Sequence, residues 1–224
     1  MQLLRGEAAA EYRVGAKAVL PFAAVIATIG VLFGYLATAA GLSPLAAVLM
    51  SGTTFAGSAQ FAAISVLAGG GTAGAAVSAS ALLNARYVPL GVAIAPALQG
   101  PFWKRLLLAQ FVVDEAWAVA YLGEGRFSRK RLVGAGIVLY ATHVAATALG
   151  TSAATLPGDP SAWGLDAAFP ALFVILLWPH VRDVSRVAAA VLGTIIALGL
   201  TPLTPPGIPV VAAAFASLLG AKSG

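Results

Sequence analysis

Apolar residues in this chain form long blocks, separated by short stretches that are polar or rich in glycine and proline. A membrane-spanning helix needs about 20 mainly apolar residues, and about eight blocks approach this pattern. The last three have about 14 residues each and reach only about 21 Å at 1.5 Å per residue. The pattern predicts an all-α, polytopic transmembrane helix bundle with about seven to eight apolar segments, some of them short, broken or re-entrant. The segments are 18–40, 45–68, 72–98, 106–123, 132–150, 165–178, 187–200 and 208–220.

The composition indicates a membrane protein without a large soluble domain. Of the 224 residues, 60% are hydrophobic and 9% are charged, whereas soluble domains are roughly 25% charged; the mean hydropathy is +0.93. We expect a cytoplasmic N-terminal segment at 1–17, a single transmembrane transport domain at 18–221 and a cytoplasmic tail at 222–224. The chain has no cysteine, which excludes disulfides and cysteine-ligated metals. We expect no cofactor and no metal site.

Basic residues lie in short clusters between the apolar blocks. A nucleic-acid partner is not expected, because such a partner requires one continuous basic face. Short basic clusters are typical of the cytoplasmic loops of membrane proteins. A cytoplasmic N-terminus followed by eight crossings places the clusters at 126–131, 182–186 and 222 inside, and only Lys104 and Arg105 fall outside. The reverse orientation misplaces more clusters. A re-entrant hairpin of the last two segments would leave six crossings and the same location for the C-terminus.

Small and turn-forming residues predict how the first helices meet. Gly30 and Gly34 form a small-residue face that allows close helix packing, and packing inside the bundle is favoured over a dimer interface. Gly41, Ser43 and Pro44 predict a helix end followed by a capped helix start.

Two apolar segments carry signals for an interruption. Hydroxyls, an amide and two glycines lie between Ser51 and Phe61, and such residues weaken a helix interior. Local unwinding there would offer backbone groups to a ligand, as in broken-helix transporters; ordinary small-residue packing is the alternative. Pro89 predicts a kink near Arg86, because proline cannot donate to the carbonyl of Ala85. The candidate substrate-binding residues are Ser51, Phe55, Gly57, Ser58, Gln60, Phe61, Asn84 and Arg86.

Ionisable side chains at membrane depth are candidates for function, and the apolar segments contain Arg86, Asp114, Glu115 and His143. The stretch at 99–105 connects the segments that contain Arg86 and Asp114. Measured along the helices from this connection, Arg86 lies at a depth of about 18 Å and Asp114 at about 12 Å, which is within side-chain reach. We therefore predict an ion pair of Arg86 with Asp114 or Glu115. The remaining acid is a candidate for proton coupling or cation binding. The alternative is a charge pair that only joins two helices. For His143 a packing role is favoured, since no acid or second histidine lies one turn away to complete a metal site.

Several short motifs resemble, in order and spacing, the AzlC family, the large subunit of branched-chain amino acid exporters. The resemblance extends from about Val14 to Ala221 and departs at His143, where relatives often carry tryptophan. It implies an inner-membrane permease of bacteria that exports leucine, isoleucine, valine and similar amino acids, together with a small membrane partner of the AzlD type. The motifs are Gly41-Leu42-Ser43, Phe55-Ala56-Gly57-Ser58-Ala59-Gln60-Phe61, Asn84-Ala85-Arg86, Asp114-Glu115 and Leu165-Asp166.

A secondary transporter of apolar amino acids, with proton coupling as one option, is therefore the expected function. Ser58, Gln60 and opened backbone amides, or instead Arg86, would bind the carboxylate of the substrate. Asp114 or Glu115 would accept from its ammonium, and Phe55 and Phe61 would form an apolar cup. A scaffold or assembly subunit of a two-component permease is the alternative. An intramembrane enzyme is disfavoured, because adjacent acids on a helix diverge by about 100° and do not form a dyad.

Overall fold

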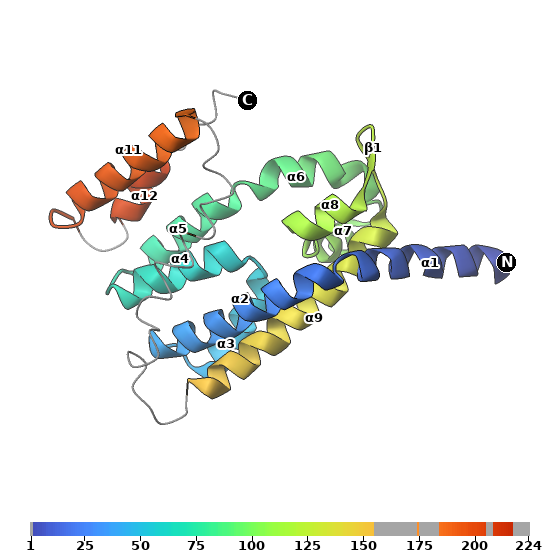
Figure 1. The fold of residues 1–224 in the computed structure, drawn as a ribbon, viewed down its shortest axis with the longest axis horizontal. Coiled ribbons are helices and arrows are strands. Elements are labelled where there is room, and N and C mark those ends of the chain that lie inside the picture. The colour runs from blue at the N-terminus through green and yellow to red at the C-terminus, as the bar shows by residue number, and fades with distance from the viewer. Residues whose placement is uncertain (1, 155–173, 175–183, 205–207, 217–224) are drawn as a thin grey trace. The chain divides into compact units, whose positions relative to one another are not determined.

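The computed structural model describes residues 2–154, 174, 184–204 and 208–216 (Figure 1). The chain divides into two compact units, each described here by itself: Met1–Gly57 with Asn84–Thr155, and Ser58–Leu83 with Leu156–Gly224. The predicted segment 165–178 lies outside the described residues, apart from position 174. In the first unit the elements are α1 (Gln2–Ala18), α2 (Leu20–Ala39), α3 (Pro44–Thr54), α6 (Tyr87–Ile94), the 3-10 helix η1 (Ala95–Ala97), α7 (Phe102–Ala109), α8 (Asp114–Ala120), β1 (Tyr121–Gly123), β2 (Arg126–Phe127) and α9 (Arg129–Ala153).

The second unit contains short apolar helices. The Ser80 hydroxyl donates to the Ala59 carbonyl at 2.8 Å and joins two of them. A Cβ at Gly193 would lie 3.4 Å from the Ala213 carbonyl oxygen, so α11 and α12 pack closely. The helices are α4 (Gly57–Ala68), α5 (Ala73–Asn84), α11 (Val184–Leu200) and α12 (Ile208–Ala214).

Two helices among the described residues are long and apolar enough to cross a membrane, namely α2 and α9. The helices α5 and α6 with η1 pass the same test only as a pair, bent by 49°. The chain is mainly helical, as predicted, but the number of seven to eight segments is not confirmed. The term all-α needs one correction: β1 and β2 form a short antiparallel hairpin at Tyr121–Phe127.

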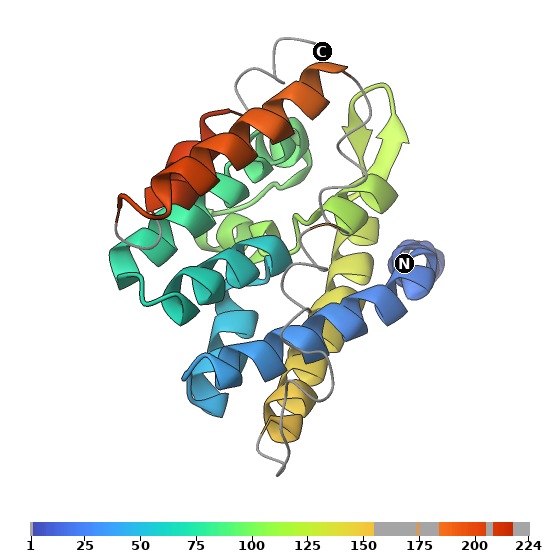
Figure 2. The ribbon, with the colours of Figure 1, turned by 60° about the vertical axis from the view of Figure 1, so that its left-hand side comes forward.

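Glycines allow α2 and α9 to lie in direct backbone contact (Figures 1 and 2). A Cβ at Gly34 would overlap the Thr147 carbonyl of α9, and one at Gly150 would overlap the Val31 carbonyl of α2. A Cβ at Gly30 would lie 2.8 Å from the His143 carbonyl oxygen. The prediction that Gly30 and Gly34 pack inside the bundle is therefore confirmed.

The turn between α2 and α3 follows the predicted signals. Gly41 has φ +93°, a value that favours glycine. The Ser43 hydroxyl accepts from the Ala46 N–H at 3.2 Å, and Pro44 is the first residue of α3. This turn places the start of α3 beside the end of α2, so α3 returns alongside α9.

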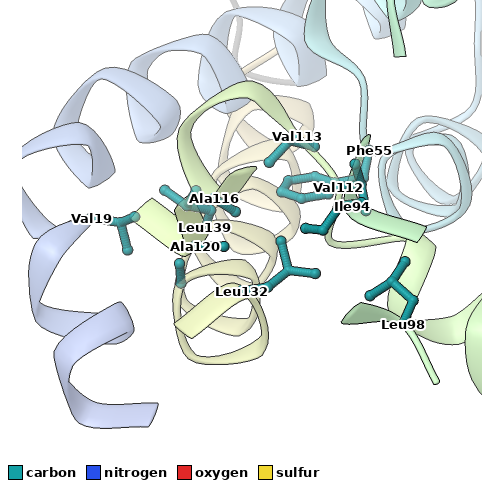
Figure 3. Packing of buried hydrophobic residues seen from close by; sticks show 11 residues of the cluster. Val19, Phe55, Ile94, Leu98, Val112, Val113, Ala116, Ala120, Leu132 and Leu139 are labelled. Atoms are coloured by element: carbon teal, nitrogen blue, oxygen red, sulfur yellow. The ribbon is translucent and has the colours of Figure 1, made fainter. Parts of the chain in front are cut away.

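A buried apolar cluster holds the first unit together and joins α6, α8, α9 and the end of α3. Figure 3 shows its side chains gathered around the start of α9 and α8. Its members come from three helices, α6, α8 and α9, and from the turns that flank the helices, so no single pair of helices forms this core. They are Val19, Phe55, Ile94, Leu98, Val112, Val113, Ala116, Ala120, Leu132, Ala135 and Leu139.

The segment predicted at 1–17 is a helix, α1, and it is bound to the first turn of α9. Three basic residues, 129–131, begin α9, where the helix dipole disfavours positive charge. Glu11 compensates: Arg131 donates to its two carboxylate oxygens at 2.9 and 3.1 Å, and the Ser128 hydroxyl donates at 3.0 Å. The Ser128 hydroxyl also accepts from the Arg131 N–H at 3.3 Å and caps the helix.

This contact predicts an acid-sensitive step in stability. Hydrogen bonds from Arg131 and Ser128 lower the pKa of Glu11 below its usual value of 4.5. Because that pKa is lower in the folded chain, the stabilisation is complete above pH 4.5 and is lost as the pH falls through the lowered value. We expect Glu11→Gln to be less stable than the unchanged chain at neutral pH and to converge with it in acid. Unfolding in detergent followed against pH measures this, and a constant difference down to low pH would contradict it.

Candidate functional site

Three interrupted helices meet beside the middle of α9 in the first unit. The chain leaves helical geometry at Phe55 after α3, at Ala85–Arg86 before α6, and at Gln110–Val113 between α7 and α8. We call the region where these three interruptions meet the junction. Hydrogen bonds and an ion pair connect them, as the following paragraphs describe.

The first interruption confirms the predicted unwinding between Ser51 and Phe61. Phe55 has φ +41°, a left-handed conformation rare for a bulky residue, and its N–H donates to the Ser51 carbonyl at 3.2 Å. The carbonyls freed nearby are occupied by side chains from other elements. Gly52 accepts from the Tyr140 hydroxyl at 2.9 Å and from Gln110 Nε2 at 3.2 Å, and Gln110 Nε2 also donates to Thr53 at 3.2 Å.

The second interruption confirms the predicted kink near Arg86. Pro89 cannot donate to the Ala85 carbonyl, and that carbonyl accepts instead from the Val88 N–H at 3.1 Å, which tightens the turn. Asn84 ends α5 just before this turn, and its Oδ1 is buried without a hydrogen-bond partner in the described part of the chain.

The third interruption corrects the prediction of one helix over 106–123. The chain instead forms α7, a non-helical stretch at Gln110–Val113, and α8. Val113 is extended, with φ −115° and ψ 160°, a conformation that β-branched residues favour. Asp114 and Glu115 therefore occupy the first turn of α8, where the helix dipole favours negative charge, and Gln110 and Asp114 do not share one helical face.

The predicted ion pair joins the second and third interruptions. Arg86 Nη2 lies 3.1 Å from Asp114 Oδ2, with side chains 41% and 46% exposed. Arg86 also donates to the Tyr87 hydroxyl at 3.0 Å, and its guanidinium lies 4.9 Å from that ring. Trp117 Nε1 donates to the Leu90 carbonyl at 3.1 Å and holds α8 against α6. Asp114 is thus the acid that pairs, and Glu115 follows it.

A pocket of about 420 Å³ lies where α8 approaches α2. Such a volume is within the range of small-molecule sites, about 300–1,000 Å³. Three of its lining residues are apolar, and the other two carry carboxylates. The lining residues are Phe22, Asp114, Glu115, Ala118 and Val119.

Several other predicted site residues pack against α9. The Ser51 and Thr147 hydroxyls form a buried hydrogen bond at 2.7 Å, and Thr147 also donates to the His143 carbonyl at 2.9 Å. Phe55 lies edge-on to Tyr140 with ring centroids 5.3 Å apart, and 5.7 Å from the His143 ring. His143 is only 2% exposed. Phe55 and His143 therefore belong to the packed wall behind the junction.

The remaining predicted residues have a different location. Gly57 ends the first of the two stretches of chain that form the first unit. A Cβ at Gly57 would lie 3.3 Å from the Ile29 side chain. Ser58, Gln60 and Phe61 belong to α4 in the second unit, where Gln60 and Phe61 are fully buried. Within the described residues no group of three or more histidine and acidic side chains gathers that could hold a metal.

Three residues of the site were not predicted as site residues. Gln110 and Tyr140 bind the freed carbonyls, and Phe22 lines the pocket. A glutamine inside an apolar segment is a signal that could have identified Gln110, because a polar side chain at that depth requires a partner. Phe22 and Tyr140 carry no comparable signal.

Comparison with known proteins gives two matches. Residues 21–156 match the family described as AzlC protein. A protein of Archaeoglobus fulgidus named "Uncharacterized membrane protein" is 30% identical over 219 residues, which cover 94% of each chain. No solved structure matches the chain.

Proposed function

Because the chain belongs to the AzlC family, we propose that it is a secondary transporter of branched-chain and similar apolar amino acids. The family and its apolar spans make it a membrane protein with a transport-related role. The substrate, the export direction and a location in the bacterial inner membrane with a cytoplasmic N-terminus belong to the proposal, as does a small membrane partner of the AzlD type.

The observation that carries the proposal is the pocket beside the Arg86–Asp114 pair. An apolar amino acid presents a carboxylate, an ammonium and an apolar side chain. Arg86 provides a fork of donors suited to a carboxylate, and Asp114 and Glu115 provide acceptors for an ammonium. Phe22, Ala118 and Val119 provide an apolar lining for the side chain.

Binding would exchange one ion pair within the protein for two with the substrate. Arg86 and Asp114 now lie 3.1 Å apart, and a zwitterion placed between them would satisfy both. Asn84 Oδ1, which has no hydrogen-bond partner among the described residues, lies two residues before Arg86 and provides a further acceptor at the junction. Glu115, the acid outside this pair, is our candidate for proton coupling.

Interrupted helices support the proposal further. In lipid, non-helical backbone is tolerated only against protein or a wet cavity, and transporters place such breaks at their substrate sites. Three breaks meet here beside an ion pair and a pocket. A subunit that serves only as a scaffold has no need for ionisable groups at this depth.

The test compares ligands that differ in one group. The purified protein in vesicles, with and without an AzlD-type partner, would be assayed for efflux of leucine, leucinamide and isoamylamine. We expect leucine to be transported and the two analogues without a carboxylate to be poor substrates, because neither engages Arg86. Equal transport of leucine and leucinamide would contradict the assignment of Arg86. No transport of any apolar amino acid under either condition would contradict the function.

A further inference from the structure

We propose that α7 and α8 form a re-entrant hairpin, which enters and leaves the membrane on the side where α9 begins. α7 then lies against the acidic lipid headgroups of that leaflet. This inference concerns the topology of the chain and the lipid contact of α7, and it does not depend on which substrate is transported. It replaces the expected crossing at 106–123.

Both ends of the hairpin are attached to the first turn of α9. Just before α7, the Gln99 carbonyl accepts from Arg129 Nη1 at 3.4 Å. At the end of α8, the Ala120 carbonyl accepts from the Ser128 N–H at 2.8 Å. The residues that enter the hairpin and those that leave it are therefore at the same level along α9.

The tip of the hairpin reaches only the middle of α9. A Cβ at Gly136 would overlap the Phe111 side chain, and the Phe111 and Tyr140 ring centroids are 6.3 Å apart. Gly136 and Tyr140 lie about 10–16 Å along the helix from Arg129, about half of a hydrocarbon core of about 30 Å. The tip ends there because Gln110 binds the carbonyls of α3.

The two arms are also too short for a crossing. α7 has 8 residues and α8 has 7, which corresponds to about 12 Å and about 10 Å.

The neighbouring helix α6 confirms the direction of α8. Its start meets the start of α8 through Arg86 and Asp114, and one turn later Leu90 meets Trp117. From Leu90 the chain of α6 continues toward Gln99, which lies beside the start of α9. Because α8 runs in the same direction as α6, α8 also returns toward the start of α9.

The composition of α7 suits the surface of a leaflet. Phe102 is 79% and Trp103 56% exposed, and Lys104 Nζ lies 5.2 Å from the Trp103 ring centroid. Tryptophan is enriched at the membrane interface, and basic residues there attract acidic lipids. Lys104 and Arg105 then lie on the same side as the basic residues at 126–131. This is also the side of the N-terminal helix α1, because Arg131 binds Glu11.

Single cysteines test this directly, because the chain has none of its own. Gln99→Cys, Lys104→Cys, Arg126→Cys and Ser152→Cys place a thiol at exposed positions before α7, within α7, after α8 and near the end of α9. Each variant would be treated with a membrane-impermeant maleimide in right-side-out and in inside-out vesicles. Detergent-permeabilised samples show that each thiol is reactive, and size-exclusion chromatography shows that each variant is folded.

We expect the first three variants to be labelled from one side and Ser152→Cys from the other. Labelling of Gln99→Cys and Lys104→Cys from the side of Ser152→Cys would overturn the hairpin. The lipid contact is tested with a Lys104→Gln/Arg105→Gln variant. We expect this variant to retain less phosphatidylglycerol after purification than the unchanged protein does. Unchanged retention would overturn the contact of α7 with acidic headgroups.

Discussion

Gly34→Ala is expected to destabilise the first unit by about 3 kcal/mol or more, at the upper end of the cost of overpacking a core. A Cβ at this position would overlap the Thr147 carbonyl and lie 2.9 Å from the Thr151 nitrogen. Both are backbone atoms within α9, so no side chain can rotate away. The two helices would have to separate, and the Ser51–Thr147 hydrogen bond next to this contact would be strained as well.

The matched control is Gly91→Ala in α6. A Cβ at Gly91 would meet nothing within 4 Å among the described residues, and alanine favours the helix by about 1 kcal/mol relative to glycine. Thermal unfolding in detergent, followed by size-exclusion chromatography, should therefore show a large loss for Gly34→Ala and none for Gly91→Ala. Equal unfolding temperatures for the two variants would show that α2 and α9 do not pack through Gly34.

Arg86→Gln is expected to lower amino acid efflux by about 10- to 100-fold, which corresponds to the loss of a hydrogen-bonded charge contact of about 1.5–3 kcal/mol. The change removes the proposed donor for the substrate carboxylate and leaves Asp114 and Glu115 without their cation. The control is Arg126→Gln, because Arg126 forms its ion pair with Glu124 at 3.4 Å on the exposed hairpin. Surface pairs of this kind contribute about 0–1 kcal/mol, so this variant should transport normally.

A double variant separates substrate binding from helix pairing. Arg86→Gln with Asp114→Asn removes both charges of the ion pair, so neither of these two residues is left as an unpaired ion. If the pair only joins the two helices, the double variant should regain both thermal stability and efflux. If Arg86 and Asp114 bind the substrate, it should regain stability while efflux stays low. Measuring both properties on the same preparation distinguishes the two roles.

The parts of the fold that depend on local signals were predictable from the sequence. The apolar lengths of α2 and α9 and the turn at Gly41 and Ser43 follow from composition and capping residues. The break near Arg86 follows from Pro89, because proline has no N–H to donate to the Ala85 carbonyl one turn earlier. The Arg86–Asp114 pair was predictable because opposite charges in an apolar segment have few partners.

The third interruption was not predicted, because the segment at 106–123 is apolar throughout much of its length and contains neither glycine nor proline in its interior. Its break depends on tertiary contacts: Gln110 binds carbonyls that another interruption frees, and Phe111 packs on Gly136. The acidic pair after Val113 is a signal for the start of a helix. The continuous apolar run on both sides of it nevertheless favoured the prediction of one helix over 106–123. The pocket was likewise not predictable, since Phe22 acquires its role only where α8 approaches α2.

The contact between Glu11 and Arg131 also sets an order of assembly. The two residues are 120 positions apart, so at a synthesis rate of about 5–20 residues per second the ribosome makes Arg131 about 6–24 s after Glu11. During that interval the Glu11 carboxylate of α1 has no arginine partner in α9, and the glycine face of α2 has no backbone of α9 to contact. The packing of α1 and α2 against α9 is therefore completed only after α9 has been synthesised.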